Sequence, residues 1–227
     1  MKYNIEAMDV KKFNHTPITT ETPSLRVETN EEGVRQYTLP NGNKYYSVTT
    51  VTGFRKNEFF KEWRQRNPKE SLRVLSRGNV LHSAIEKYLN NEEDFLEGVA
   101  PNEYILFEQA LPELNNINNV RCQEKSLWSD TLRLAGRVDC VAEYKGKLSI
   151  IDFKGATKSK RREDIDNYLM QATAYAIMWQ ERTGIKIENV VILITSEDGT
   201  VGVFESNPLK HTKQLYECIQ EYSETVV

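Results

Sequence analysis

Hydrophobic residues recur every three to four positions in several stretches of the chain, a spacing typical of amphipathic helices. The predicted helices cover residues 56–67, 71–90, 102–117, 164–183 and 209–224. In the first helix, Phe59, Phe60 and Trp63 share one face. The apolar face of the second consists of Leu72, Leu75, Leu81, Ile85 and Leu89. Pro112 disturbs the third helix, and Gly184 ends the fourth.

Runs rich in β-branched and aromatic residues predict strands between these helices. Two strand-like runs flank a turn at Asn41-Gly42 in QYTLPNGNKYYSVTTVTG, and the remaining runs are NVRCQEKSLWS, LAGRVDCVAEY, KLSIIDFK, VVILIT and VGVFES. Asp198-Gly199 fits a turn between the last two. Residues 1–35 are polar and read as an irregular arm. This order predicts one α/β (α+β) domain, with a central mixed β-sheet flanked by helices.

The hairpin of LAGRVDCVAEY and KLSIIDFK carries the most informative polar residues. Lys145-Gly146 fits a two-residue turn, and the register that it sets places Asp139 opposite Asp152, with Cβ atoms about 4.5–5.5 Å apart. Lys154 lies two residues after Asp152 and therefore projects from the same face. Facing carboxylates repel each other unless a cation lies between them. The pattern therefore predicts a metal site with a lysine beside it.

A structural interpretation of the same residues stays open at this point. The pattern D-x-K is weak, since Asp9-Val10-Lys11 also matches it in the predicted arm. Asp152 and Lys154 could simply pair with each other on an edge strand. A register slip of one residue would send Asp139 to the opposite face.

Three further features favour a functional site. His82 and Glu86 lie four residues apart on the second helix, next to its apolar stripe, and Gln171 and Tyr175 repeat this spacing on the fourth. A basic run follows the hairpin within ten residues and could hold phosphates; it consists of Lys158, Lys160, Arg161 and Arg162. Each feature alone is more often a packed polar pair or a solvated loop.

Together these residues resemble the RecB-like branch of the PD-(D/E)XK nucleases. The resemblance covers about 77–180 and runs through RGNVLHSAIEKYL, LAGRVD, IIDFK and QATAY, which match a helical His, a G-x-x-D strand, a D-x-K strand and a Q-x-x-x-Y helix. Upstream, YYSVTTVTGFRKNEFFKEWRQRN resembles the segment before the nuclease core in mitochondrial genome maintenance exonucleases and related phage proteins. The resemblance implies a restriction-endonuclease-like core at 71–227. It also implies that the arm, hairpin and helix of 1–70 contribute to DNA binding.

The resemblance also assigns roles to residues. It makes His82, Asp139, Asp152 and the Phe153 carbonyl the metal ligands, and it places Asp139, Asp152, Lys154, Gln171 and Tyr175 in the catalytic set. Glu86 and Glu124 are expected beside the ligands rather than among them. Besides the basic run, the residues expected to contact DNA are Arg77, Arg64 and Trp63. Two positions depart from the family pattern: Val138 replaces the proline, and Gly155 stands where close relatives carry Thr.

Composition limits the alternatives. No apolar run approaches the ~18 residues of a membrane span. Cys122, Cys140 and Cys218 are far apart and form no CxxC pair, so we expect no disulfide framework and no iron–sulfur cluster. The first residues resemble neither a signal peptide nor a transit peptide, and we expect a cytosolic protein of phage or bacterial origin. The net charge of −3 argues against general affinity for polyanions.

The resemblance implies an Mg²⁺- or Mn²⁺-dependent exonuclease that acts on single-stranded DNA, including ends or flaps, without sequence specificity in phage or bacterial replication, recombination or repair. Lys154 could stabilise the transition state as a point charge or deprotonate the attacking water, and we favour the first role because nearby carboxylates oppose loss of its proton. The alternatives are a nuclease-like fold that binds DNA without cleaving it, a structure-dependent endonuclease, and a structural cation site in a protein–protein module.

Overall fold

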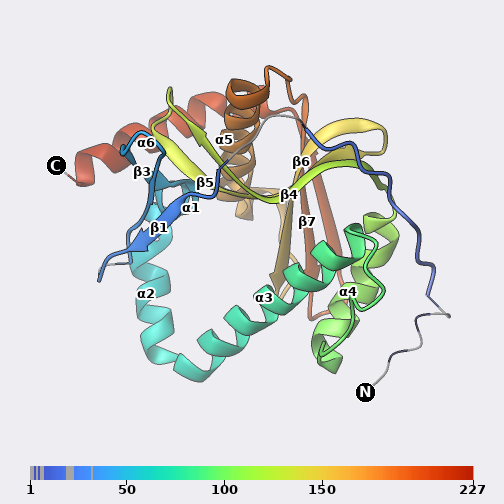
Figure 1. Ribbon diagram of the computed structural model, residues 1–227. Coiled ribbons are helices and arrows are strands. Elements are labelled where there is room, and N and C mark those ends of the chain that lie inside the picture. Colours follow the sequence, from blue (N-terminus) through green and yellow to red (C-terminus); the bar gives the residue numbers. More distant parts are fainter. Residues whose placement is uncertain (1–2, 4, 6–7, 19–22, 32, 227) are drawn as a thin grey trace.

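The computed structural model describes residues 3, 5, 8–18, 23–31 and 33–226, and these residues form an eight-stranded sheet (Figure 1). The strands are β1 Arg26–Thr29, β2 Arg35–Thr38, β3 Lys44–Ser47, β4 Ile117–Ser129, β5 Leu134–Tyr144, β6 Lys147–Ala156, β7 Asn189–Ser196 and β8 Val201–Ser206. Their order is β1-β2-β3-β5-β6-β7-β8, and β4 also pairs with β5. The pairs β3–β5 and β6–β7 are parallel and the others antiparallel, which confirms the predicted mixed sheet.

Helices cover both faces of this sheet (Figure 1). They are α1 Val48–Gly53, α2 Asn57–Arg66, α3 Pro68–Leu89, α4 Pro101–Leu114, α5 Asp166–Thr183 and α6 Thr212–Thr225. One core cluster joins α1, α5 and α6 to the sheet around Trp179, and a second joins α4 and the end of α3 around Phe107. No helix in the described part of the chain is both long and apolar enough to cross a bilayer.

The local signals at the turns are confirmed. Lys145 and Gly146 both have left-handed backbone angles, with φ of 49° and 77°, as a two-residue hairpin of this kind requires. Gly199 adopts φ of 87° between β7 and β8, and Gly184 caps α5 with φ of 73°. The long helix α5 crosses from β6 to β7, which is the connection that two parallel neighbours need.

Two sequence-based assignments near the N-terminus are wrong. The run after Tyr46 is not a strand beyond Ser47, because Val48–Gly53 forms the short helix α1. Its β-branched residues favour a strand locally, but Val48 and Val51 are completely buried in the core beside α5, so tertiary packing overrides that preference. The expected irregular arm contains β1, which pairs with β2.

The helices α2 and α3 form an arch that stands away from the body of the molecule (Figure 1). The arch residues Phe59, Leu72 and Leu75 are 67%, 68% and 61% exposed, so the faces predicted to be apolar do not pack into the core here. The apolar side chains of α3 that are buried in the core, Leu81, Ile85 and Leu89 among them, lie in its second half. Because α3 begins at Pro68, the boundary expected at residues 70/71 falls inside this helix.

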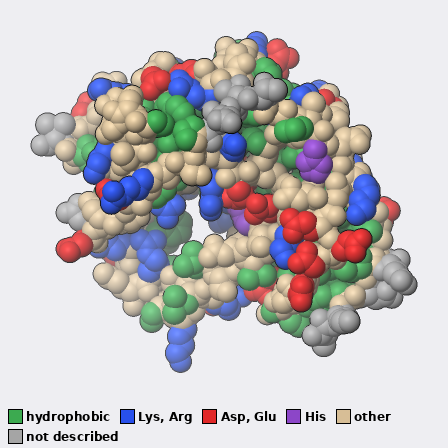
Figure 2. Space-filling view, viewed as in Figure 1, with side chains coloured by type: hydrophobic (Ala, Val, Ile, Leu, Met, Phe, Trp, Pro, Cys, Tyr) green, Lys and Arg blue, Asp and Glu red, His purple; other side chains and the backbone are tan. Residues whose placement is uncertain are grey.

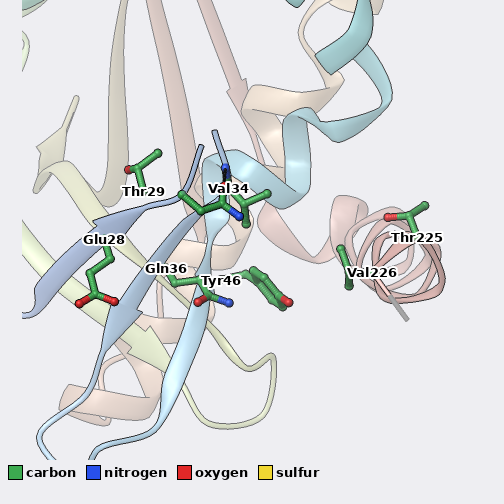
Figure 3. Close-up of a pocket in the computed structure, with 8 residues that line it drawn as sticks. Glu28, Thr29, Val34, Gln36, Tyr46, Thr225 and Val226 are labelled. Atoms are coloured by element: carbon green, nitrogen blue, oxygen red, sulfur yellow. Dashed lines mark hydrogen bonds between the residues drawn. The ribbon is translucent and has the colours of Figure 1, made fainter. Parts of the chain in front are cut away.

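Figure 2 shows an opening between this arch and the body of the molecule. Lys and Arg side chains gather on one side of the opening, and Asp and Glu side chains lie on the rim that the body forms. A different hollow lies between the strands β1–β3 and the end of α6 (Figure 3). Glu28, Gln36, Tyr46 and Thr225 help to line it, and it contains none of the residues expected to be catalytic.

Candidate active site

The two aspartates lie where the ladder between β5 and β6 ends. The pairs run from Tyr144–Lys147 to Cys140–Ile151, so the predicted register is confirmed up to the position next to Asp139 and Asp152. At that point Asp139 Oδ2 accepts a hydrogen bond of 3.0 Å from the Phe153 N–H. The Asp139 carboxylate thus accepts the Phe153 N–H in place of a backbone carbonyl of β5. The backbone pairing between the two strands ends at this point.

Asp152 is a buried carboxylate with only one satisfied oxygen. Its side chain is 2% exposed, and Oδ1 accepts hydrogen bonds from Lys154 Nζ at 2.7 Å and Gln171 Nε2 at 3.1 Å. Oδ2 has no hydrogen-bond partner among the described residues. Burial raises the pKa of Asp152 to about 6; Lys154 opposes this shift and Asp139 adds to it. A buried oxygen without a partner marks a position for a cation or a proton.

Lys154 remains an ammonium in this setting. Burial opposes its charge, but the carboxylates of Asp152 and Asp139 outweigh burial and raise the pKa of the amine above its usual value. The ammonium also lies 5.4 Å from the centre of the Tyr168 ring, within the range of a cation–π contact. The residue is therefore equipped to supply positive charge rather than to accept a proton.

His82 reaches the same place from α3. Its Nε2 lies 2.7 Å from the Phe153 carbonyl oxygen, and its Nδ1 lies 3.7 Å from Asp139 Oδ2 and 3.9 Å from Glu124 Oε1. Burial works against the charged imidazole, but the Glu124 and Asp139 carboxylates prevail and raise the pKa of His82. The helical histidine, the G-x-x-D strand and the D-x-K strand thus come together, as the sequence predicted.

Glu124 belongs to this cluster more closely than the sequence indicated. Ligand atoms of His82, Glu124 and Asp139 all lie within 4.8 Å of one another. Glu124 has a left-handed backbone with φ of 47° inside β4, an uncommon conformation for a residue with a side chain. Its Oε2 also pairs with Arg137 Nε at 2.7 Å. Glu86 lies one turn after His82 on α3, and burial, followed by the charge of Glu124, raises its pKa.

The donor set suits a hard divalent cation. Carboxylate and carbonyl oxygens are the preferred ligands of Mg²⁺, and imidazole is more compatible with Mn²⁺. His82 would offer its Nδ1 to the ion, since this nitrogen faces Asp139 Oδ2 at 3.7 Å and Glu124 Oε1 at 3.9 Å, while its Nε2 lies at hydrogen-bond distance, 2.7 Å, from the Phe153 carbonyl oxygen. With the unpartnered Oδ2 of Asp152, the residues fit such an ion.

The Q-x-x-x-Y pair lies behind this cluster rather than on its surface. Gln171 is 7% exposed and donates a hydrogen bond to Asp152 Oδ1, and Tyr175, one turn further along α5, is 2% exposed. Tyr175 therefore lies beneath the surface of the cluster, and its place in the catalytic set stays a prediction. A Cβ on Gly136 would lie 2.7 Å from the Tyr175 hydroxyl, so the glycine of the G-x-x-D strand makes room for the ring.

The residues expected to bind DNA fall into two groups. Lys158, Lys160, Arg161 and Arg162 are exposed in the loop after β6, and Arg64 is exposed beside the half-buried Trp63 on the arch. Arg161 pairs with Glu163 at 3.0 Å, and Arg162 with Asp166 at 3.5 Å. Arg77 does not fit its predicted role, because it is 2% exposed and its guanidinium contacts Glu197.

Comparison with known families agrees with this geometry. The model of the PD-(D/E)XK nuclease superfamily matches residues 46–222, which is most of the chain. The chain belongs to this superfamily. PD-(D/E)XK nucleases hydrolyse phosphodiester bonds and generally use divalent metals, and the His82–Glu124–Asp139 cluster provides a candidate site for one. The predicted family and fold class are therefore confirmed.

Individual relatives are similar to this chain over part of their length. The mitochondrial genome maintenance exonuclease 1 of Homo sapiens is 31% identical over 134 residues, which is 56% of this chain and 38% of that protein. The protein of the same name from Mus musculus is 28% identical over 155 residues, 63% of this chain and 46% of that protein. The chain thus spans less than half the length of each. A solved structure of a candidate exonuclease from Eubacterium rectale matches 67% of this chain and 66% of its own at 12% identity and a TM-score of 0.46, too weak a similarity to add to the family match.

Proposed function

We propose that this nuclease is a metal-dependent exonuclease that hydrolyses single-stranded DNA without sequence specificity. The observation that carries the proposal is the convergence of His82, Glu124 and Asp139 beside a buried Asp152–Lys154 pair. Simple DNA binding gains nothing from carboxylates held this close together, because they repel phosphates. They become favourable when a cation is bound.

The residues have distinct roles in this proposal. His82, Asp139, Asp152 and the Phe153 carbonyl would hold Mg²⁺ or Mn²⁺, and Glu124 adds a further oxygen at the same place. The bound ion would lower the pKa of a water molecule and polarise a phosphoryl oxygen. Lys154 stabilises the negative charge that develops on the phosphoryl group, because its amine keeps its proton. Gln171 keeps the Asp152 carboxylate oriented.

The arch supports the choice of a single-stranded substrate with a free end. The opening in Figure 2 has basic side chains on one side and acidic side chains on the rim of the body, and a strand that passed through it would run along both. A strand can enter an enclosed opening only by its end. Exposed Phe59 and Phe60 on α2 can stack on unpaired bases, which duplex DNA does not offer.

The test uses labelled linear and circular single-stranded DNA with Mg²⁺ or Mn²⁺. We expect the wild type to digest the linear strand and spare the circular one, and Asp152→Ala and Lys154→Ala to lose cleavage while their circular dichroism spectra stay unchanged. Cleavage of circular DNA would favour an endonuclease. A wild type that retains DNA uncut with either ion would reject catalysis and leave the DNA-binding alternative. Action in phage or bacterial replication, recombination or repair, and a cytosolic location, remain predictions.

A further inference from the structure

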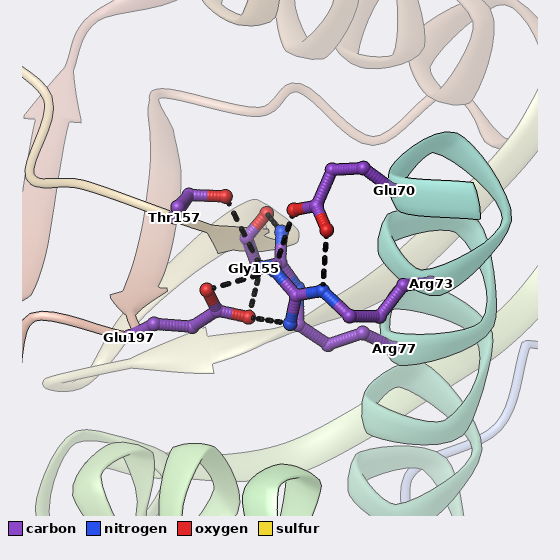
Figure 4. Close-up of polar contacts among 6 residues, drawn as sticks. All are labelled: Glu70, Arg73, Arg77, Gly155, Thr157 and Glu197. Carbon is purple, nitrogen blue, oxygen red and sulfur yellow. Dashed lines mark hydrogen bonds and ion pairs between the residues drawn. The ribbon is translucent and has the colours of Figure 1, made fainter. Parts of the chain in front are cut away.

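A network of charged residues ties the first half of α3 to the turn after β7 (Figure 4). Glu197 Oε1 lies 2.5 Å from Arg73 Nη1 and 2.5 Å from Arg77 Nη1, and its Oε2 accepts from Arg73 Nη2 at 3.1 Å. Glu70 holds Arg73 from within the helix, with contacts of 2.6 and 2.8 Å. The Glu197 N–H donates to the Ala156 carbonyl at 3.0 Å, which fixes the turn against β6.

Arg77 connects this network to the catalytic strand. Its Nη2 donates to the Gly155 carbonyl at 3.2 Å, and Gly155 is the residue directly after Lys154. Its Nη1 also lies 3.4 Å from Thr157 Oγ1. A Cβ on Gly155 would lie 3.4 Å from Arg77 Nε, an ordinary contact distance, so the guanidinium packs directly over this glycine.

The same helix carries His82 five residues further on, about 7.5 Å along its axis. The exposed Leu72 and Leu75 give the first half of α3 little packing of its own. Among the described residues, the contacts of Glu197 with Arg73 and Arg77 therefore fix where this half of the helix lies against β6. Groups that orient metal ligands from behind alter metal affinity when they are removed.

We propose that Glu197 is a positioning residue: through Arg77 it holds α3 against β6, so that His82 stays on the Phe153 carbonyl beside Asp139. The inference rests on the proposed function, because it concerns the same metal site. Across the residues that the structure describes, Glu197 makes polar contacts with Arg73, Arg77 and the Ala156 carbonyl, and none with His82, Glu124 or Asp139. Its effect should therefore be seen in metal binding and turnover rather than in affinity for DNA.

The experiment measures Mn²⁺ binding to the full chain by electron paramagnetic resonance, without DNA and independently of cleavage. We expect Glu197→Gln to weaken Mn²⁺ binding about 10-fold to 100-fold, a range typical for residues that support metal ligands. Glu197→Asp keeps the charge and should recover part of the loss. Glu217→Gln is the matched control, since Glu217 forms an exposed ion pair of 3.7 Å with Lys213 on α6 and should change nothing.

Turnover and DNA binding separate positioning from a general structural role. We expect Glu197→Gln to lower kcat on linear single-stranded DNA, while the Kd for DNA without metal stays unchanged. Unchanged Mn²⁺ affinity in a folded Glu197→Gln overturns the inference, even if its thermal midpoint falls. Should that variant not fold, Arg77→Lys keeps the charge but loses the forked guanidinium that contacts both Glu197 and the Gly155 carbonyl, and wild-type Mn²⁺ affinity in it would overturn the inference equally.

A reference variant separates the two proposals. Asp139→Asn removes a ligand and should lose Mn²⁺ binding. If Asp139→Asn loses Mn²⁺ binding while Glu197→Gln binds Mn²⁺ as tightly as the wild type, the positioning role is rejected and the proposed nuclease activity is unaffected. A wild type that binds no Mn²⁺ rejects the proposed metal dependence itself, and the inference with it.

Discussion

At the scale of single residues, the site retains groups that stability alone would disfavour. Asp152 loses nearly all contact with water, and only Oδ1 is compensated, by Lys154 and Gln171. An uncompensated buried oxygen costs roughly 1–3 kcal/mol, more when charged. Such a cost is typical of functional sites, where local rules of folding are broken for chemistry. Cation binding would remove much of it.

Gly136 provides a stability prediction at the same scale. In Gly136→Ala the new Cβ would lie 2.7 Å from the Tyr175 hydroxyl and 3.0 Å from its Cε1, which forces the buried ring to shift. Overpacking of this kind should lower the free energy of unfolding by about 1–3 kcal/mol. Urea denaturation measures the change.

Gly78→Ala is the control for that substitution. Gly78 is in α3, and a Cβ there meets nothing within 4 Å. This variant should be as stable as the wild type or gain about 0.5–1 kcal/mol, since alanine favours helix. Equal stability of the two alanine variants would contradict the tight fit between Gly136 and Tyr175.

At the scale of elements, α3 is held in two different ways. Its second half is fixed by apolar burial around Leu81 and Leu89, and its first half by the ionic contacts of Arg73 and Arg77 with Glu197. Burial of apolar groups is insensitive to pH, whereas ionic contacts depend on the charge of the carboxylate. The two halves should therefore respond differently to acid.

The pKa of Glu197 sets the pH range in which the ionic contacts of the first half of α3 are lost. Hydrogen bonds from Arg73, and then those from Arg77, lower the pKa of Glu197 from 4.5 to about 2. A carboxylate with a lowered pKa in the folded state stabilises it above the unfolded pKa, and the contribution disappears as the pH falls towards the folded pKa. Wild type should exceed Glu197→Gln in unfolding free energy by about 1.5–3 kcal/mol at pH 7.

This advantage should shrink as the pH falls from 4.5 to about 2. Urea titrations of wild type and Glu197→Gln at pH 7, 4 and 3 measure this change. The control variant Glu217→Gln should differ little from wild type in unfolding free energy at any pH. A gap between wild type and Glu197→Gln that is independent of pH would show that the carboxylate charge is not what stabilises this contact.

The sequence predicts elements best where one face is buried. The buried half of α3, the strands β5 and β6 and the turn at Lys145-Gly146 follow from periodicity and turn chemistry. Periodicity fails for α1, whose β-branched residues favour strand, and for the arch, whose apolar residues remain exposed. Periodicity cannot distinguish an apolar face that packs into the core from an apolar face that stays exposed to solvent, as on the arch.

The site shows the same limit. The facing aspartates could be inferred because a hairpin register is fixed by its turn. Glu124 was underestimated, because its closeness to Asp139 depends on a left-handed residue in β4 that no pattern of residue types reveals. Arg77 was misassigned, because a buried arginine and a DNA-binding arginine look alike in sequence.

At the scale of the whole molecule, charge is distributed so that DNA would be held locally. The chain has a net charge of −3, yet four basic residues, at positions 158–162, lie in the loop after β6, close in sequence to Lys154. Of these, Arg161 and Arg162 already form ion pairs with acidic neighbours. Lys158 and Lys160 are exposed, so we expect them to contribute more to phosphate binding.

The double variant Lys158→Ala, Lys160→Ala should bind single-stranded DNA more weakly. Each lost phosphate contact should reduce the slope of log K against log salt by about 0.7, so the two should reduce it by about 1.4. Fluorescence anisotropy with a labelled oligonucleotide over a salt series measures this slope. Lys186→Ala is the control, since Lys186 lies beyond the opposite end of α5, whose 18 residues span about 27 Å. An unchanged slope in the double variant would place the DNA path elsewhere.

The left-handed backbone at Glu124 has a consequence for how this protein tolerates change. Glycine would adopt that conformation at no steric cost, whereas a residue with a side chain gives up about 1–3 kcal/mol. Glu124→Gly should therefore relieve this backbone strain and so favour the folded state. It would also remove one oxygen ligand from the cluster. Selection for thermal stability alone would therefore favour loss of a candidate metal ligand at position 124.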